Sequence, residues 1–253
     1  MNSQYAIETV HLKKTYRGKA GPTLDDLCLR IPYGSLFGLL APNGAGKTTA
    51  INVICGLRRF DGGAVFVGGH SIATEMKAVK PLLGLVPQEI ALFPSLTARE
   101  NLKIFGGLNG LSGSKLNSRV DELLTLFDLT QSRDTIIGHF SGGMKRRINL
   151  IAGMLHSPRI LILDEPTVGV DAQSRKLILD KLLEINRSGT TILFISHYLE
   201  EAEEICSEVA FMDRGTILCQ GNPSRLKAGY SECPNLESLY LTLTGKKMRD
   251  HHE

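Results

Sequence analysis

The feature of this sequence that most constrains its fold is a glycine-rich turn between an apolar strand and a helix. The turn reads APNGAGKTT over residues 41–49. It follows the apolar run SLFGLL, typical of a buried parallel strand, and leads into a segment of helical character over residues 48–57. Glycines let the backbone N–H groups of such a turn face a phosphate, and the helix N-terminus adds its dipole. The arrangement therefore predicts an α/β fold with a phosphate-binding loop.

The side chains of this loop predict how it binds a nucleotide. Lys47 is placed to reach the β- and γ-phosphates, and the hydroxyl of Thr48 to bind Mg²⁺. Ala41 stands where the strict pattern has glycine, and its methyl group fits if its φ angle is negative. A plain glycine turn is the alternative, which the flanking strand and helix disfavour. The loop residues predicted to bind nucleotide are Asn43, Gly44, Ala45, Gly46, Lys47, Thr48 and Thr49.

An acidic pair forms the second candidate site. In RILILDEPT, residues 159–167, four apolar residues deliver Asp164 and Glu165 to the carboxyl end of a buried strand, where α/β sheets bind ligands. Asp164 is predicted to hold Mg²⁺ through its hydration shell, and Glu165 to accept a proton from the attacking water. Alone, such a pair is more often a solvated turn or a helix cap. The phosphate-binding loop in the same chain favours the catalytic interpretation.

The third segment is FSGGMKRR, residues 140–147. Ser141 is a candidate N-cap, and Gly142 and Gly143 leave backbone N–H groups uncovered at the start of a helix. Such a helix end attracts anions. Alone the segment is a common turn, so its significance comes from its position shortly before the acidic strand.

Taken together and in this order, the three segments resemble the ABC ATPase family over residues 5–221. APNGAGKTT resembles the Walker A loop, FSGGM the signature motif and LILDEP the Walker B strand. Gln88 in LVPQE is similar to the Q-loop glutamine, Asp171 in VGVDAQS to the D-loop aspartate, and His197 in FISHYLEEAE to the switch histidine. Tyr16 is similar to the aromatic residue that stacks on adenine.

The resemblance implies a role for each of these four residues. Gln88 would bond both Mg²⁺-bound water and the nucleophile, and the imidazole of His197 would reach the γ-phosphate. Tyr16 would offer its ring to adenine, the alternative being packing on the sheet. Asp171 would cap its own helix and also lie at a dimer interface. Lys47, Gln88, Glu165 and His197 are thus the predicted catalytic residues, and Thr48, Gln88 and Asp164 the predicted metal ligands.

The resemblance also implies a partner and a task. Two cassettes, expected to be identical copies, would pack head to tail, with each phosphate-binding loop closed by Ser141 and Gly143 of the other. ATP hydrolysis would drive integral-membrane permease subunits from the cytoplasmic face of the cell membrane. SGGMKRR and DEPTVGVD resemble type-2 export ATPases, which favours export of a drug, lipid or polysaccharide-like substrate, although import stays open. Met144 and Phe140 depart from the usual glutamine and leucine of the signature and leave its serine and glycines intact.

Three other kinds of ABC protein are less compatible with the sequence. Too few residues separate Lys47 from Ser141 for the coiled coil of a DNA-repair ATPase, and the single cassette disfavours a two-cassette translation factor. A regulator that does not hydrolyse ATP is disfavoured because Glu165 and His197 are both present. The formal net charge of +3 does not call for a nucleic-acid partner either.

The predicted fold class is α/β: a P-loop NTPase core with a mixed, mostly parallel sheet, an N-terminal antiparallel β subdomain and an inserted α-helical subdomain. One ABC ATPase domain is expected over residues 1–230, with core segments 1–88 and 157–230, a helical subdomain at 89–156 and a tail at 231–253. Thr97 and Glu100 predict a capping box within the insert. The segment around Leu92 and Phe93 is expected to contact permeases, these two residues being either exposed or part of the core.

Composition limits the remaining possibilities. No signal peptide and no run of about 20 apolar residues is found, so the sequence predicts a soluble or peripheral protein. The five cysteines are scattered and never form a CxxC pair, which argues against a disulfide framework or a zinc site and predicts that each packs as a small apolar residue. Residues 250–253, DHHE, are more often solvated at a chain end than metal-binding.

Overall fold

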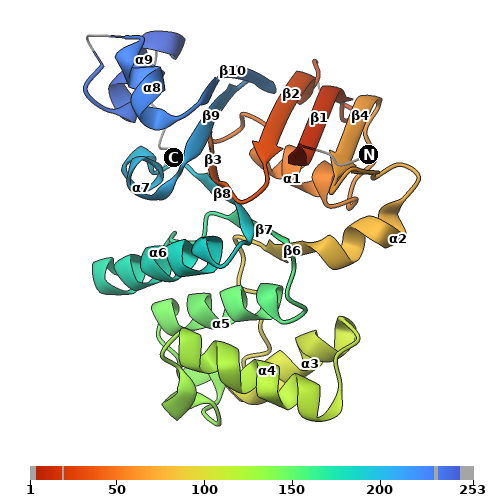
Figure 1. Ribbon diagram of the computed structural model, residues 1–253, viewed down its shortest axis with the longest axis vertical. Coiled ribbons are helices and arrows are strands. Elements are labelled where there is room, and N and C mark those ends of the chain that lie inside the picture. Colours follow the sequence, from red (N-terminus) through yellow and green to blue (C-terminus); the bar gives the residue numbers. More distant parts are fainter. Residues whose placement is uncertain (1–3, 19, 231–232, 246–253) are drawn as a thin grey trace.

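The computed structural model describes residues 4–18, 20–230 and 233–245, and two sheets form its centre (Figure 1). One sheet has four strands in the order β2-β1-β4-β5, and the other has six in the order β10-β9-β3-β8-β7-β6. The strands of the first are β1 Tyr5–Lys14, β2 Leu24–Pro32, β4 Gly62–Val67 and β5 His70–Ser71. Those of the second are β3 Leu36–Leu40, β6 Leu83–Val86, β7 Ile160–Asp164, β8 Thr191–Ser196, β9 Glu208–Asp213 and β10 Thr216–Gly221. The predicted mixed, mostly parallel sheet is confirmed.

The six-stranded sheet is buried on both faces in the middle. β3, β7 and β8 are buried along their whole length, which explains why their sequences are continuously apolar rather than alternating. β3 pairs in parallel with β8 and with β9, and β8 pairs in parallel with β7. The carboxyl ends of β3, β7 and β8 therefore meet at one edge of the sheet, where parallel sheets bind ligands.

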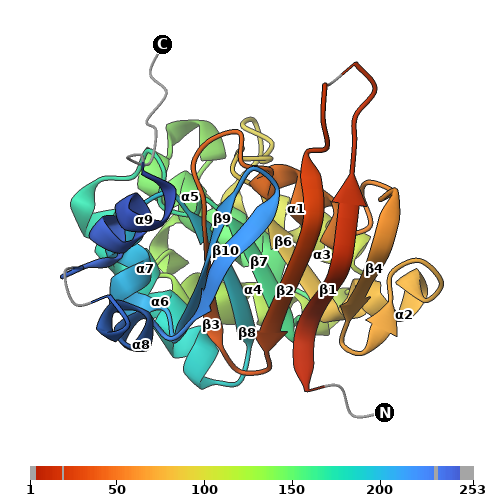
Figure 2. The same ribbon diagram turned by 90° about the horizontal axis from the view of Figure 1, so that it is seen from above.

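The four-stranded sheet is antiparallel and covers α1 Lys47–Ile54 with its apolar face (Figure 2). Leu12, Leu27 and Leu29 are buried there in one cluster with Ile51 of the helix. Along β1, the buried side chains of Ile7 and Thr9 are two residues apart, and the next buried one, Leu12, lies three residues further on. The register of β1 against β2 shifts between Thr9 and Leu12. This β-bulge breaks the period of two along the strand.

Three helices between β6 and β7 form the lower part of the molecule in Figure 1. They are α3 Ala98–Leu108, α4 Gly113–Leu126 and α5 Gly142–Met154, which lie within the predicted helical insert. The capping box of Thr97 and Glu100 is confirmed. The segment before α3 was expected to be either exposed or part of the core, and each alternative holds for one residue. Leu92 packs partly against the core, whereas Phe93 is 47% exposed.

The C-terminal third continues the alternation and then adds a helical cap. α6 Ala172–Arg187 follows β7, α7 Leu199–Ile205 follows β8, and α8 Pro223–Ala228 and α9 Leu236–Thr244 follow β10. Leu236, Leu239 and Tyr240 of α9 are buried, and the ring of Tyr240 lies 5.6 Å from that of Phe211. Residues 250–253, considered above as a metal site, lie outside the described residues.

Two further expectations concern the membrane and the cysteines. Across the ranges that the structure describes, every helix is too short or too polar to cross a bilayer. All five cysteines are unpaired. Cys206 and Cys233 are buried as expected, but Cys28 is exposed on β2, so the expectation that each cysteine packs in the interior is wrong for this one. Two short helices precede β6, namely α2 Met76–Val79 and the 3₁₀ helix Lys80–Leu82.

Candidate functional site

A hollow of about 190 Å³ lies where the phosphate-binding loop meets the carboxyl end of β7. It brings together three parts of the chain that are far apart in sequence: the loop, Gln88 and the acidic pair. Of the predicted residues, its lining includes Asn43, Gly44, Gly46, Lys47, Thr48, Thr49, Gln88, Asp164 and Glu165. Thr23 and Pro42 complete it. Ala45 lies beneath the loop and is buried.

The backbone of the loop depends on glycine at two positions. Gly44 and Gly46 have φ angles of 80° and 108°, which residues with a side chain rarely adopt. A Cβ on Gly46 would also lie 2.8 Å from the carbonyl oxygen of Thr23. Ala41 is not among the residues with positive φ, so the condition for its methyl group is met. The loop therefore keeps the backbone conformation that its glycines allow even though it starts with alanine.

Lys47 is buried at the first position of α1. Its Nζ donates to the carbonyl oxygen of Ala41 at 2.6 Å and lies 3.5 Å from Oε1 of Glu165. Burial lowers the pKa of the Lys47 ammonium, and the nearby carboxylates of Glu165 and Asp164 raise it in opposition. The ammonium is thus held at the mouth of the loop by two acceptors, where it can donate to an anion.

The surroundings of Asp164 oppose the ionisation of its carboxyl group. Burial raises the pKa of its carboxyl to about 6, and the charge of Glu165 adds to this effect, while Lys47 and Arg146 act in the other direction. A nearby cation therefore stabilises the ionised form of this carboxylate, as does any cation bound in the hollow.

Glu165 and His197 are joined directly. Nδ1 of His197 lies 2.8 Å from Oε2 of Glu165, across the ends of the neighbouring strands β7 and β8. Glu165 has a φ of 51° and donates its backbone N–H to the carbonyl oxygen of Ile195, so the chain turns sharply at this residue. The ring of Tyr198 lies 4.1 Å from that of His197. The contact with His197 fixes one oxygen of the Glu165 carboxylate, and the other faces Lys47.

Gln88 is exposed at the rim of the hollow, and its backbone is anchored by residues that the sequence analysis missed. Arg146 of α5 donates to the carbonyl oxygens of Pro87 and Gln88 at 3.3 and 2.8 Å, and Asn149 donates to Pro87 at 3.2 Å. Both are buried. The signature helix is therefore attached to the segment that carries Gln88 across 58 residues of sequence.

A second missed contact lies behind the acidic strand. The hydroxyl of Thr167 donates to Oε2 of Glu201 at 2.6 Å, and Glu201 is buried on α7. Burial raises the pKa of Glu201, and the hydrogen bond from Thr167 opposes the shift. The turn that follows Glu165 is thus attached to the helix that follows His197. A polar pair 34 residues apart gives no local signal in the sequence.

Tyr16 lies beside the loop and outside the residues that line the hollow. Its hydroxyl is 3.5 Å from that of Thr49, and Nζ of Lys14 lies 5.5 Å from the centre of its ring. The side chain is half-buried, so part of the ring faces solvent next to the first turn of α1. This position suits stacking on a base as well as packing on the sheet, so both interpretations remain.

The signature residues lie apart from the hollow. Ser141 caps α5 by accepting from the backbone N–H of Met144 at 3.2 Å, and Asp171 caps α6 by accepting from that of Ser174 at 2.9 Å. The bond from Ser174 holds the pKa of Asp171 below its usual value. Gly143 packs against Ser174 so closely that a Cβ would collide with its hydroxyl and lie 2.7 Å from its Cβ. Both predicted caps are therefore present, and the two helix ends are in contact.

Comparison with known families decides the identity of this fold and site. The family model described as ABC transporter matches residues 24–168, which is more than half of the chain. The chain belongs to the ABC transporter family. As a member of it, this ABC protein is an ATPase, and its resemblance to that family in the sequence is confirmed.

Relatives and solved structures agree with the assignment. The linearmycin resistance ATP-binding protein LnrL of Bacillus subtilis is 42% identical over 220 residues, which are 87% of this chain and 70% of the relative. The Nod factor export ATP-binding protein I of Paraburkholderia xenovorans is 38% identical, covering 92% and 76%. A solved structure of an ATP binding subunit of an ABC transporter superposes with a TM-score of 0.84 at 28% identity, over 94% of this chain and 99% of that one.

The raised pKa of Asp164 predicts a change in stability. Because the folded-state pKa of about 6 exceeds the ordinary 3.8, this group stabilises the fold below pH 3.8 and loses that contribution as pH rises through 6. Asp164→Asn cannot ionise, so at pH 8 we expect it to raise the free energy of unfolding by about 1–3 kcal/mol. Urea denaturation of the wild type and of Asp164→Asn at pH 8 and at pH 5 measures the difference in the free energy of unfolding. Asp180→Asn on α6 is the control; a gain for Asp164→Asn that does not shrink at pH 5 would contradict the assignment.

The close packing of Gly143 gives a second prediction. Gly143→Ala is expected to lower the free energy of unfolding by about 1–3 kcal/mol, because Ser174 occupies the space that the methyl group needs. Gly142→Ala is a matched control, since its Cβ would lie 3.6 Å from the carbonyl oxygen of Gly169, an ordinary contact. Chemical denaturation of both variants measures the difference. Equal stabilities would show that α5 and α6 are not in the contact described.

Proposed function

We propose that this ABC ATPase is the nucleotide-hydrolysing subunit of an exporter, acting as a head-to-tail pair on separate integral-membrane permease subunits. One observation carries the proposal. The residues that line the hollow at the phosphate-binding loop make up one half of an ATPase site. The helix N-terminus at Ser141, which would belong to the other half, lies apart from this hollow. A helix end with uncovered N–H groups binds anions. A second copy turned by a two-fold axis supplies such a helix end to the loop of the first.

The residues in the hollow divide the work of hydrolysis. Lys47 and the N–H groups of the loop bind the phosphates and neutralise their charge. Glu165 accepts the proton of the attacking water, and His197 orients its carboxylate through the contact at 2.8 Å. Gln88 orients the water from the opposite rim. Tyr16 stacks on the base, and Ser141, Gly142 and Gly143 bind the γ-phosphate of the partner's nucleotide, with Asp171 at the interface.

The donor set of the hollow also fits Mg²⁺. Thr48, Gln88 and Asp164 offer only oxygen donors, which Mg²⁺ prefers, and all three line the same hollow. The opposed ionisation of Asp164 is relieved by a bound cation. When bound, Mg²⁺ would offset the charge that develops on the phosphate oxygens. Thr48, Gln88 and Asp164 are therefore the proposed metal ligands, directly or through water.

The direction and substrate class are proposed from the relatives. Their names concern linearmycin resistance and Nod factor export. A drug, lipid or polysaccharide-like molecule is therefore the proposed cargo. The helical part of the protein, α3 to α5, offers a surface for permeases at the half-exposed Phe93, next to the segment that carries Gln88. The contacts of Arg146 attach this surface to the nucleotide site, so a change at Gln88 moves α5 with it.

The test uses Glu165→Gln with Mg-ATP, which blocks the proposed base and retains the bound nucleotide. Extraction from native membranes in mild detergent is expected to yield a multi-span membrane protein in stoichiometric amount. Light scattering of the purified variant should show twice the mass of the 27.7 kDa chain with Mg-ATP and a single mass with Mg-ADP. The double variant Glu165→Gln/Ser141→Arg is the control, because a long cation at the signature prevents closure.

Two outcomes would contradict parts of the proposal. Recovery of ribosomes or DNA without any membrane protein would remove the transport function and leave the ATPase. A single mass with Mg-ATP in the Glu165→Gln variant would contradict the head-to-tail pair.

A further inference from the structure

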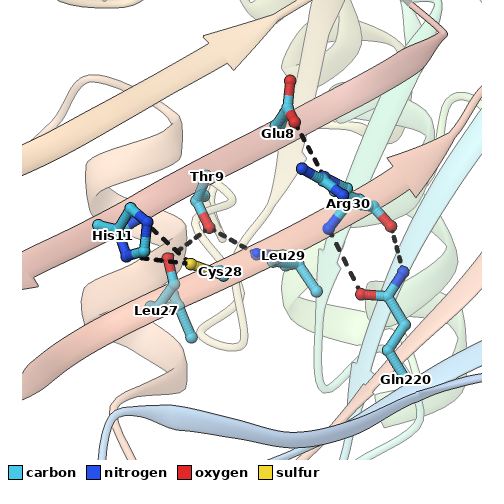
Figure 3. Close-up of polar contacts among 8 residues, drawn as sticks. All are labelled: Glu8, Thr9, His11, Leu27, Cys28, Leu29, Arg30 and Gln220. Carbon is cyan, nitrogen blue, oxygen red and sulfur yellow. Dashed lines mark hydrogen bonds and ion pairs between the residues drawn. The ribbon is translucent and has the colours of Figure 1, made fainter.

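Three side chains that the nucleotide site does not use gather on the exposed face of the antiparallel sheet. Nδ1 of His11 lies 2.7 Å from Oδ1 of Asp26 and 3.7 Å from Sγ of Cys28. All three ligand atoms lie within 4.8 Å of one another. Figure 3 shows the side chains of His11 and Cys28 turned toward each other from the adjacent strands β1 and β2. This group, called here the sheet-face cluster, therefore combines a nitrogen, an oxygen and a sulfur donor.

Irregular backbone on both strands creates the cluster. The pairing of β1 with β2 shifts register between Thr9 and Leu12 and again between Leu12 and Lys14. His11 and Asp26 have φ angles of 48° and 64°, so each departs from strand geometry. In a regular strand, side chains alternate between faces, and a β-bulge redirects them. Two irregularities side by side thus turn a histidine and an aspartate toward one cysteine.

Hydrogen bonds fix Cys28 in this position. The hydroxyl of Thr9 accepts from the backbone N–H of Leu29 and donates to the carbonyl oxygen of Leu27, both at 2.9 Å (Figure 3). These bonds hold the residues on both sides of Cys28 against β1. The backbone N–H of His11 points at Sγ of Cys28 from 3.3 Å. The thiolate is the form of cysteine that binds metals.

The spacing of the three donors is close to that of a tetrahedral zinc site. With Zn–N near 2.05 Å and Zn–S near 2.3 Å, a tetrahedral angle separates the nitrogen and sulfur ligands by about 3.6 Å. The cluster has 3.7 Å. The corresponding nitrogen–oxygen separation is about 3.4 Å, and here it is 2.7 Å, so the distance from Nδ1 of His11 to the carboxylate of Asp26 has to lengthen by about 0.7 Å. The exposed side chain of Asp26 can do this by rotation.

The surroundings leave the cluster open to solvent, and the cations two positions away on β1 and β2 each lie near a carboxylate. The side chains of His11 and Asp26 are 68% and 56% exposed. Arg30 is paired with Glu8 at 3.0 Å, and Lys13 lies 3.9 Å from Asp25. His11 and Cys28 also line a hollow of about 750 Å³ between β2 and β10. A fourth ligand can therefore approach from solvent.

We propose that His11, Asp26 and Cys28 bind one Zn²⁺ ion, with water as the fourth ligand. The metal joins Nδ1 of the neutral imidazole, a carboxylate oxygen and the thiolate, and the proton of the thiol is released to solvent. Three protein ligands with one open position are a known arrangement for zinc. The bound ion ties β1 to β2 at the point where their hydrogen-bond ladder is interrupted. The sequence pattern disfavoured a zinc site because the ligands come from two strands and not from a CxxC pair.

The test is a titration of the full-length chain with Zn²⁺ in the presence of a chromogenic chelator and without nucleotide. The wild type is expected to bind one equivalent of Zn²⁺ and to bind it more tightly than the variants do. Cys28→Ser, His11→Asn and Asp26→Asn remove one donor each, and asparagine tolerates the positive φ at residues 11 and 26. Each is expected to weaken binding at least about tenfold. His70→Asn is the matched control, because His70 pairs with Glu75 at 2.9 Å but belongs to no group of three potential metal ligands among the described residues.

Cobalt(II) gives a readout that depends on the sulfur itself. Co²⁺ bound by the wild type is expected to show a sulfur-to-metal charge-transfer band and the visible bands of a tetrahedral ion. Cys28→Ser should lose the first band, and its unchanged thermal unfolding would show that the fold persists. A variant with His251 and His252 replaced by asparagine serves as background and removes any contribution of this histidine pair to metal binding. No Zn²⁺ binding in competition with a chelator of micromolar affinity, or equal binding by Cys28→Ser, would overturn the proposal.

Discussion

Glu165→Gln is expected to reduce ATP turnover by about 10²–10⁴-fold while ATP binding stays within a few-fold of wild type. The carboxylate is buried between Nζ of Lys47 and Nδ1 of His197, at 3.5 and 2.8 Å. Glutamine has the same size, and its amide oxygen accepts from either neighbour, so the geometry of the site persists. It has no affinity for a proton, so the step that needs a base is lost. Turnover is measured by phosphate release and binding by titration with a fluorescent ATP analogue.

A nearby buried glutamate provides the control for this prediction. Glu201 accepts a hydrogen bond from Thr167 and lies outside the residues that line the hollow. Glu201→Gln preserves that bond through its amide oxygen and is expected to keep most of the turnover. If Glu165→Gln retained turnover within tenfold of wild type, Glu165 would not be the base. If both variants lost turnover equally, the effect would come from the packing of the β7 turn and not from proton transfer.

Local motifs made much of the site predictable. The loop at Gly44 and Gly46 and the acidic pair at Asp164 and Glu165 each depend on a strand followed directly by a turn, and such a pattern is contiguous in sequence. Parallel pairing of β3 with β8 and of β8 with β7 then brings the strand ends together. The fold class followed from the strand, glycine-rich turn and helix at residues 35–57 and from the resemblance to the ABC ATPase family. The roles of the individual side chains stay predictions until the variants are measured.

Contacts between distant segments and irregular backbone were not predictable in the same way. Arg146 binds the carbonyl oxygens beside Gln88 from 58 residues away, and its own segment looks like an ordinary basic helix start. The bulge at His11 interrupts the alternation of β1 and places the imidazole beside Cys28 on the neighbouring strand, which no count of apolar residues reveals. α9 is short and was not assigned because its packing against the rest of the chain decides its conformation. These features depend on tertiary contacts that a single sequence does not display.

Lys47→Met is expected to weaken ATP binding by about 10–100-fold, because a hydrogen bond to a charged group contributes about 1.5–3 kcal/mol. Methionine fills nearly the same volume as the lysine stem, so the change isolates the ammonium. Loss of the ammonium also leaves Asp164 and Glu165 without the cation that lies 3.5 Å from Glu165. The uncompensated carboxylates then repel the phosphates of ATP, which weakens binding further. Isothermal titration with ATP in the presence of Mg²⁺ measures the effect.

The comparison of ATP with adenosine separates the role of Lys47 from a general disturbance of the site. If the ammonium acts on phosphate, Lys47→Met weakens ATP binding and leaves the much weaker binding of adenosine unchanged, because the ring of Tyr16 is unaltered. Lys176→Met controls for the loss of one positive charge, since Lys176 is 60% exposed on α6 and pairs with Asp180 and Glu204. An ATP affinity of Lys47→Met within threefold of wild type would mean that the loop N–H groups hold the phosphates without the lysine. Lys47 would then serve to balance the charge of the buried carboxylates.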